Sequence, residues 1–197
     1  CARGCSVDEV MDLVMSGLSE ANINAATISC AVSVDLKADE PAMHAVAAIL
    51  GVPFRVFDAA TLDAETPRLA NPSDLVFAEI GAHGVCEAAS LAATGPAGKL
   101  VLEKRKSANA TMALAQMPTL GDGIMPGRKP GRVMLIGIGP GQAAWRTPEA
   151  SRLIQSADEL VGYGLYIDIL GPMAAHLPRR DFALGEQEDR CRYSLET

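Results

Sequence analysis

Aromatic and basic residues are scarce in this sequence. Its 197 residues include one Trp, three Tyr and four Phe, and 17 Lys and Arg stand against 24 Asp and Glu, for a formal net charge of −7. Nucleic acids and anionic membranes bind clustered Lys and Arg, so we expect neither as a partner. No apolar run reaches the roughly 18 residues of a membrane-spanning helix, and no signal-peptide pattern is present. We therefore expect a cytoplasmic protein.

Metal-binding patterns are also missing. The five cysteines are scattered and odd in number, which is unlike a disulfide framework, and we expect free thiols. The spacing from Cys1 to Cys5 is that of half an iron–sulfur motif, but Asp8 stands where a third cysteine would be needed. The histidines share no ligand spacing; they are His44, His83 and His176. We expect no bound metal.

Stretches with helical patterns alternate with β-rich stretches along the sequence. Apolar residues make up 49% of the chain, enough for a sizeable core. Ser6 and Glu9 have the spacing of a capping box and predict the start of a helix. Pro41 suits the first turn of a second helix, and Gly51 suits its end. Together with the β-rich runs TISCAVSV, PFRVF, GKLVLEK and TMALAQM, this alternation predicts a three-layer α/β fold.

A change of composition divides the chain. Residues 118–131, PTLGDGIMPGRKPG, hold four glycines and three prolines and cannot continue a helix or a central strand. We interpret this segment as the linker between a domain of residues 1–117 and a domain of residues 132–197. In the second domain, VMLIGIG over 133–139 and the later DELVGY are strand candidates on either side of a helix, which predicts a βαβ unit.

We expect both ends of the chain to be truncated. The sequence opens on a turn-like CARGCS without an initiator Met, so the first strand of the first domain is expected to be missing. The other end stops inside a helical pattern, EDRCRYSLET. We interpret the chain as an internal piece of a longer protein.

Glycines follow the first strand candidate of the second domain, where Gly137, Gly139 and Gly141 surround Pro140. A dinucleotide-binding turn needs glycines that open the helix directly and an acidic residue at the end of the second strand, and this sequence meets neither condition well. A Walker loop is excluded because no Gly-Lys-Ser/Thr follows. The residues alone leave two alternatives, a tight turn with no ligand and a ligand-binding loop of another kind.

The segments GIGPG, TPEA, ADELVGYGLYIDIL and FALGEQEDR resemble, in this order, the opening of the tetrapyrrole methylase family, and within it the precorrin-3B C17-methyltransferases of cobalamin biosynthesis. The resemblance covers about residues 132–197. It implies S-adenosyl-L-methionine as cofactor, a precorrin as substrate and a homodimer, with Tyr163 bordering the substrate. The implied cofactor contacts are Gly137, Gly139, Pro140 and Gly141. Many relatives carry Asp where this chain has Gln142, and no catalytic residue is identified.

The segments CARGCSVDEV, SVDLKADEPAMHAVAAILGVPF, EIGAHGVCEAASLAATG and LVLEKRKSANATMALA resemble the CobE family and the C-terminal domain of the CbiG family, also from cobalamin biosynthesis. This resemblance covers about residues 1–116. Charge-assisted hydrogen bonds suit carboxylate recognition. The candidate contacts to a precorrin are Lys37, Glu40, Glu87 and Lys104, with Arg105 and Lys106 beside the last. The alternatives are a solvated surface for the lysines and, for Glu87, a charge that favours a helix N-terminus.

The two resemblances imply one pathway. The parent protein is expected to be an S-adenosyl-L-methionine-dependent C-methyltransferase of cobalamin biosynthesis fused to a CobE-like domain. This fragment alone is expected to be inactive. A non-enzymatic tetrapyrrole carrier of the same pathway is the alternative, and ring-opening lactone chemistry is a third hypothesis.

Overall fold

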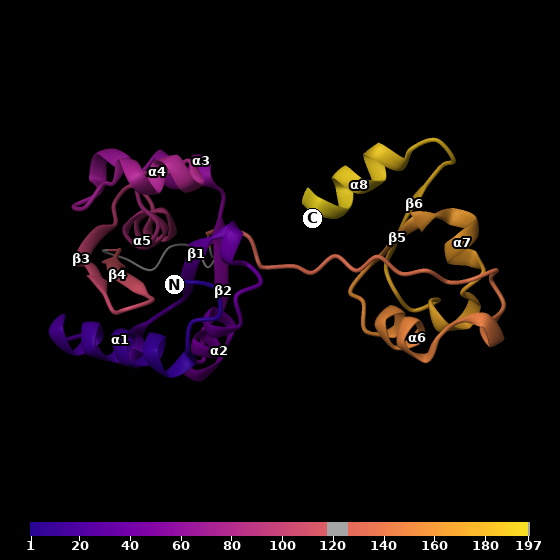
Figure 1. Cartoon of the computed structure of the whole chain (residues 1–197), viewed down its shortest axis with the longest axis horizontal. Coiled ribbons are helices and arrows are strands. Elements are labelled where there is room, and N and C mark those ends of the chain that lie inside the picture. Colours follow the sequence, from indigo (N-terminus) through magenta and orange to yellow (C-terminus); the bar gives the residue numbers. More distant parts are fainter. Residues whose placement is uncertain (118–125, 197) are drawn as a thin grey trace. The chain divides into compact units, whose positions relative to one another are not determined.

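The computed structural model describes residues 1–117 and 126–196, and the chain divides into two compact units, Cys1–Pro130 and Gly131–Thr197 (Figure 1). Most of the predicted linker lies outside the described residues, because the description stops at residue 117 and resumes at residue 126. Within the described ranges, no helix is long and apolar enough to cross a membrane.

The first unit is a mixed α/β fold, as predicted. Its strands form two small sheets, in which β1 runs parallel to β2 and β3 runs antiparallel to β4. The strands are β1 (Ala31–Val34), β2 (Phe54–Phe57), β3 (Lys99–Lys106) and β4 (Thr111–Gln116). The helices are α1 (Val7–Glu20), α2 (Pro41–Leu50), α3 (Ala59–Asp63), α4 (Asp74–Ile80) and α5 (Cys86–Thr94). Helices α1 and α2 lie on one side of the strands, and α3 and α4 lie on the other (Figure 1).

Helix α5 contributes four buried apolar residues to the core of the first unit, Ala88, Ala89, Leu91 and Ala93. Its residues Ala88 and Ala89 are fully buried, and their small side chains let the helix approach the neighbouring elements closely. Leu62 of α3 is also fully buried in this cluster, together with Val34 of β1 and Phe57 of β2. The core therefore fixes where α5 begins relative to the strands.

Helix α1 begins at the predicted place but without the predicted capping box. The Ser6 side chain makes no capping hydrogen bond. The Glu9 carboxylate reaches across to the hairpin between β3 and β4, where it accepts hydrogen bonds from Ser107 Oγ at 2.5 Å, the Asn109 amide at 2.7 Å and Asn109 Nδ2 at 3.0 Å. The capping-box prediction is wrong because these distant donors bind the carboxylate that would have closed the box.

Helix α2 confirms the local signals in the sequence. Pro41 occupies its first turn, and the helix ends at Gly51, whose φ of 69° lies in the left-handed region that glycine adopts without strain. Glu40, the residue before the helix, is 1% exposed. The roles of Pro41 and Gly51 needed no tertiary information, because each depends on the backbone of a single turn.

The pairing of β3 with β4 contains a β-bulge. Leu102 pairs with Leu114 and Arg105 pairs with Met112, so three steps along β3 correspond to two steps along β4. A bulge removes a residue from the hydrogen-bonded ladder and re-aims side chains, and such irregularities are frequent beside functional sites. Lys104 lies inside this irregular stretch.

The second unit is built around one small parallel sheet, in which β5 pairs with β6 from Leu160 beside Arg179 to Tyr163 beside Phe182. Its elements are α6 (Pro148–Gln155), β5 (Leu160–Tyr163), α7 (Gly164–Asp168), β6 (Arg179–Phe182) and α8 (Gln187–Glu196). The predicted helix after the glycines and the predicted strand DELVGY are therefore both present, as α6 and β5.

The predicted strand over residues 133–139 is not a strand in the structure. Leu135 is 97% exposed, whereas Ile136 and Ile138 pack against the core cluster around Ile154. The βαβ prediction is wrong for this segment, because residues 133–139 form no strand and β5 pairs with β6 instead. A strand requires a hydrogen-bonding neighbour, and an apolar run does not specify which segment supplies it.

Candidate functional site

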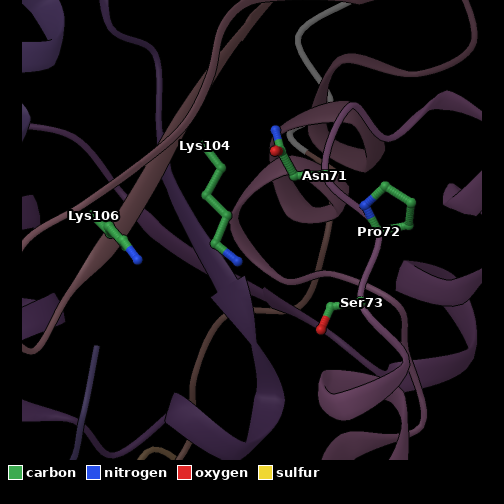
Figure 2. Close-up of a pocket in the computed structure, with 5 residues that line it drawn as sticks. All are labelled: Asn71, Pro72, Ser73, Lys104 and Lys106. Carbon is green, nitrogen blue, oxygen red and sulfur yellow. The ribbon is translucent and has the colours of Figure 1, made fainter.

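A cavity in the first unit lies between strand β3 and the loop that leads into α4. Its volume is about 340 Å³, and it is lined by Asn71, Pro72, Ser73, Lys104 and Lys106 (Figure 2). We call it the lysine pocket. Both lysines extend from β3 toward the side of the pocket formed by the loop (Figure 2). The loop side offers the Asn71 amide and the Ser73 hydroxyl, so every polar side chain of the lining can bind an anion or a neutral polar group.

A second, smaller cavity of about 120 Å³ shares two residues with the lysine pocket, Asn71 and Lys104. Its other lining residues come from α4, from the start of α5 and from β4; they are Val76, Gly84, Val85, Cys86, Glu87 and Thr111. The two cavities therefore adjoin at the point where the loop before α4 meets β3.

The two pocket lysines have no ion-pair partner among the described residues. Four of the five arginines in this unit form ion pairs in the described part of the chain, Arg55 being the exception: Arg3 binds Asp39, Arg68 binds Glu65, Arg105 binds Glu20 and Arg128 binds Asp35. In a chain of net charge −7, two unpaired ammonium groups at one cavity form a local positive site. This arrangement suits an anionic ligand.

The Glu87 carboxylate forms the back of this region and is 2% exposed. Its Oε1 accepts hydrogen bonds from the Lys104 amide and from Asn71 Nδ2, both at 2.8 Å. Its Oε2 accepts hydrogen bonds from the Ala70 amide at 3.0 Å and the Asn71 amide at 2.9 Å. Burial acts to raise the pKa of Glu87, but the hydrogen bonds from Lys104, Asn71 and Ala70 together hold it below its ordinary value.

Two of the four candidate contacts in the first unit lie at these cavities, and two do not. Lys104 lines both cavities and Glu87 lines the smaller one. Lys37 and Glu40 are absent from both linings; Glu40 is buried and accepts a hydrogen bond from the Gly4 amide at 3.2 Å. Substrate contact by Lys37 and Glu40 stays a prediction, at a place separate from the lysine pocket.

Three pocket residues were not singled out from the sequence: Asn71, Pro72 and Ser73. The Asn-Pro pair is a turn signal, and Ser73 caps α4 by accepting a hydrogen bond from the Val76 amide at 3.4 Å. These signals identify a turn before a helix. They do not reveal that the turn faces β3, because the link between them runs through the Glu87 carboxylate.

The glycine loop of the second unit combines two positions whose backbone conformation only glycine adopts readily with one open position. Gly139 and Gly141 have φ values of 66° and 103°, which side-chain-bearing residues rarely adopt. A Cβ atom at Gly141 would lie 2.7 Å from Cγ2 of Ile169, and one at Gly139 would lie 3.1 Å from the carbonyl oxygen of Trp145. A Cβ atom at Gly137 would meet no other atom within 4 Å. The loop is therefore tightly folded at its end and open at its start.

Tyr163, the last residue of β5, packs on Tyr166 of α7. The ring centroids of Tyr163 and Tyr166 are 5.4 Å apart with an interplanar angle of 90°. Tyr166 is 57% exposed, so an aromatic edge is available to solvent beside the half-buried Tyr163. Across residues 1–117 and 126–196, no group of three His, Cys, Asp or Glu side chains could hold a metal ion, and the five cysteines are free thiols.

Comparison with known proteins gives a consistent result for the first unit. Residues 1–115 match the family described as Cobalamin synthesis G C-terminus. The chain is 43% identical over 120 residues to protein CobE of a Sinorhizobium species, covering 61% of this chain and 78% of that protein. The crystal structure of CobE, a protein from the cobalamin (vitamin B12) biosynthetic pathway, matches with a TM-score of 0.55 and 34% identity over 58% of this chain and 84% of that one.

Two longer relatives match the same part of the chain. The cobalt-precorrin-5A hydrolase of Priestia megaterium is 32% identical over 118 residues, covering 60% of this chain and 31% of the hydrolase. The cobalamin biosynthesis protein CobIJ of Mycobacterium tuberculosis is 31% identical over 117 residues, covering 52% of this chain and 23% of that protein. The chain thus spans less than a third of the length of each of these two relatives.

Proposed function

Because the chain belongs to the Cobalamin synthesis G C-terminus family and is a protein of cobalamin biosynthesis, we propose that its first unit binds a precorrin through the carboxylate side chains of the macrocycle. The lysine pocket is the proposed contact. The observation that carries the proposal is the pair of ammonium groups, Lys104 and Lys106, which face one cavity without an ion-pair partner in the described part of the chain.

The size of the cavity limits what enters it. A volume of about 340 Å³ is at the small end of the range for ligand pockets. One or two carboxylate side chains fit such a space, and the planar macrocycle then lies across the rim. Lys104 and Lys106 supply charge-assisted hydrogen bonds to the carboxylates, while the Ser73 hydroxyl and the Asn71 amide complete the polar lining.

We also propose that the parent protein is an S-adenosyl-L-methionine-dependent precorrin methyltransferase, which acts as a homodimer. The proposal rests on the resemblance of residues 132–197 to the tetrapyrrole methylases. The cofactor would supply the methyl group that is transferred to a carbon of the macrocycle.

The glycine loop is compatible with that cofactor. Gly137 leaves open space beside the backbone, so a ligand can approach the chain closely there. Pro140 has no backbone N–H, which removes a donor that a pyrophosphate group would use. In this proposal Gly137, Gly139, Pro140 and Gly141 hold S-adenosyl-L-methionine, and Tyr163 borders the macrocycle.

A second candidate function is a non-enzymatic carrier of tetrapyrrole intermediates. The composition of the lysine pocket favours it for the first unit, because an amide, a hydroxyl and two ammonium groups bind carboxylates without an obvious acid–base pair. In that case the first unit holds the intermediate and the second unit contributes no chemistry.

The proposed binding of carboxylates is tested by changing the ligand while the protein stays unaltered. The chain is titrated, by absorbance, with a porphyrin that carries carboxylate side chains and with the same porphyrin after esterification of those groups. We expect binding of the acid form, weakening as salt is added, and little binding of the ester. Equal affinity for both forms would contradict recognition through carboxylates.

The methyltransferase proposal needs the full-length parent protein. Calorimetry on the parent should show binding of S-adenosyl-L-methionine or its demethylated product, with no binding of NAD. The carrier hypothesis predicts porphyrin binding by the first unit and no response of the parent to S-adenosyl-L-methionine. Tight NAD binding would instead show that the glycine loop serves a dinucleotide.

A further inference from the structure

The two walls of the lysine pocket come from segments that are distant in the sequence, the loop at residues 70–73 and strand β3, whose lining residues Lys104 and Lys106 follow the loop by more than 30 residues. Within the described ranges, no backbone-to-backbone hydrogen bond joins them. The Ser73 amide donates to the carbonyl of His83 at 2.8 Å, which ties the loop to the segment before α5. Something else must hold the loop and the strand at the separation that makes a pocket.

The Glu87 side chain makes that connection. One carboxylate oxygen, Oε1, accepts a hydrogen bond from the strand, at the Lys104 amide, and another from the loop, at Asn71 Nδ2. The other oxygen, Oε2, accepts both loop amides, those of Ala70 and Asn71. Four donors converge on one buried carboxylate, and a carboxylate is the side chain with enough acceptor sites to bind all of them.

The Lys104 amide is available for this bond because the register of the β3–β4 pair gives Lys104 no partner on β4. In a regular ladder the amides of β3 would either point to β4 or to the opposite side, with side chains alternating between faces. The irregular step between Leu102 and Arg105 takes Lys104 out of register with β4, and its amide is bound by Glu87. The backbone of Lys104 is thereby fixed from α5, and the direction of its side chain follows from that backbone.

From these contacts we propose that Glu87 is a positioning residue of the lysine pocket, which sets the separation of its walls and the direction of Lys104 without touching the ligand. The inference rests on the proposed binding of carboxylates in this pocket. Because all four acceptor positions of Glu87 are used within the protein, the charge offered to a ligand comes from Lys104 and Lys106.

The substitution Glu87→Gln distinguishes a positioning role from a purely electrostatic role, because the two roles predict opposite changes in the affinity for an anion. Removing a negative charge close to the pocket would, by charge alone, tighten the binding of an anion. Positioning predicts the opposite, because the amide NH₂ of Gln would face N–H donors and release one wall of the pocket. With a carboxylate-bearing porphyrin as probe, we expect the dissociation constant of Glu87→Gln to rise by about tenfold.

Two further variants make the measurement specific. Glu79→Gln removes the same charge from an exposed position on α4 that lines neither cavity, and its affinity should stay within a factor of about two of the unaltered chain. Lys104→Ala should weaken binding less in the Glu87→Gln background than alone, because Glu87 acts through Lys104. Additive effects would contradict that route and indicate a general loss of structure.

A ligand-free measurement covers the case in which Glu87→Gln does not fold. In the unaltered chain, NMR signals from the Glu87 carboxyl and from the amides of Ala70, Asn71 and Lys104 should shift together on acidification, with a midpoint below the ordinary value of 4.5. Amide signals that stay in place while the carboxyl titrates would overturn the proposal.

The results of these binding experiments distinguish the positioning role of Glu87 from the binding of carboxylates in the lysine pocket. If the unaltered chain binds the porphyrin and Glu87→Gln binds it equally well or more tightly, the positioning role is wrong and the pocket proposal stands. If the unaltered chain does not bind the carboxylate-bearing porphyrin, the pocket proposal fails, and the positioning role fails with it.

Discussion

The backbone amide of Lys104 donates a hydrogen bond of 2.8 Å to the Glu87 carboxylate, which links the start of α5 to the bulge in β3. The link joins a buried acidic side chain to the strand that carries both lysines of the pocket. It makes the stability of the first unit and the shape of its pocket depend on the same group.

The first prediction concerns that dependence. Glu87→Gln should lower the free energy of unfolding by roughly 1 to 3 kcal/mol, because buried N–H donors lose their acceptors. Urea denaturation followed by circular dichroism measures this change. Glu79→Gln, at an exposed site on α4, is the matched control and should change stability by less than about 0.5 kcal/mol. Equal stability of the two variants would mean that the four hydrogen bonds to Glu87 contribute little.

The second prediction is a pH dependence from Glu9. The hydrogen bonds from Ser107 and Asn109 lower the pKa of Glu9 to about 2, from an ordinary value of 4.5. A carboxyl group whose pKa is lower in the folded state stabilises the fold above its unfolded-state pKa and loses that effect as the pH falls toward the folded-state value. We therefore expect the contribution of Glu9 to be complete above about pH 5 and to disappear between about pH 4.5 and pH 2.

Thermal unfolding measured across this pH range tests the assignment. Glu9→Gln should be less stable than the unaltered chain at neutral pH, and the difference should shrink as the pH falls. Asp8→Asn removes a carboxylate from the same first turn of α1, at an exposed position, and serves as the control. A difference that stays constant down to pH 2 would show that Glu9 does not titrate as the structure implies.

The third prediction concerns the glycine loop of the second unit. Gly141→Ala places a Cβ atom 2.7 Å from Ile169 at a φ of 103°, and should destabilise the second unit by about 1 to 3 kcal/mol. Gly137→Ala meets no atom within 4 Å and should leave the fold intact. The single tryptophan, Trp145, lies next to Gly139 and reports unfolding of this loop by fluorescence.

The same pair of variants bears on the proposed cofactor. In the full-length parent, Gly137→Ala should weaken the binding of S-adenosyl-L-methionine although the fold survives, because the added methyl group occupies the open space beside the backbone. Unchanged affinity in Gly137→Ala would remove the start of the loop from the cofactor site. It would leave the tight turn without a ligand as the better interpretation.

Local features of the fold could be predicted from the sequence, and features that depend on distant partners could not. Pro41 and Gly51 bound α2 because each acts on the backbone of its own turn. Glu9 was assigned to a capping box, yet its partners Ser107 and Asn109 come from a hairpin near the far end of the first unit. No pattern within a single turn reveals such a contact.

The residues of the candidate site also divide into those that the sequence identifies and those that depend on distant partners. Lys104 was identified from its charge and from the resemblance to CobE-like proteins, and it lines the pocket. Asn71 and Ser73 were missed because their loop is linked to β3 through the buried Glu87 carboxylate, which is a tertiary contact. The strand predicted over residues 133–139 failed for a related reason, since the choice of β6 as the neighbour of β5 is made by tertiary packing.

The most direct test of the central claim is the affinity of the chain for a carboxylate-bearing porphyrin after removal of the pocket charges. Lys104→Ala and Lys106→Ala should each weaken binding by roughly 1 to 3 kcal/mol, as expected for the loss of a charge-assisted hydrogen bond. Lys99→Ala removes the same charge from an exposed position on the same strand, outside the pocket lining, and should leave the affinity unchanged. Equal affinities for the unaltered chain and all three variants would contradict the assignment of the lysine pocket as the site that binds the carboxylates.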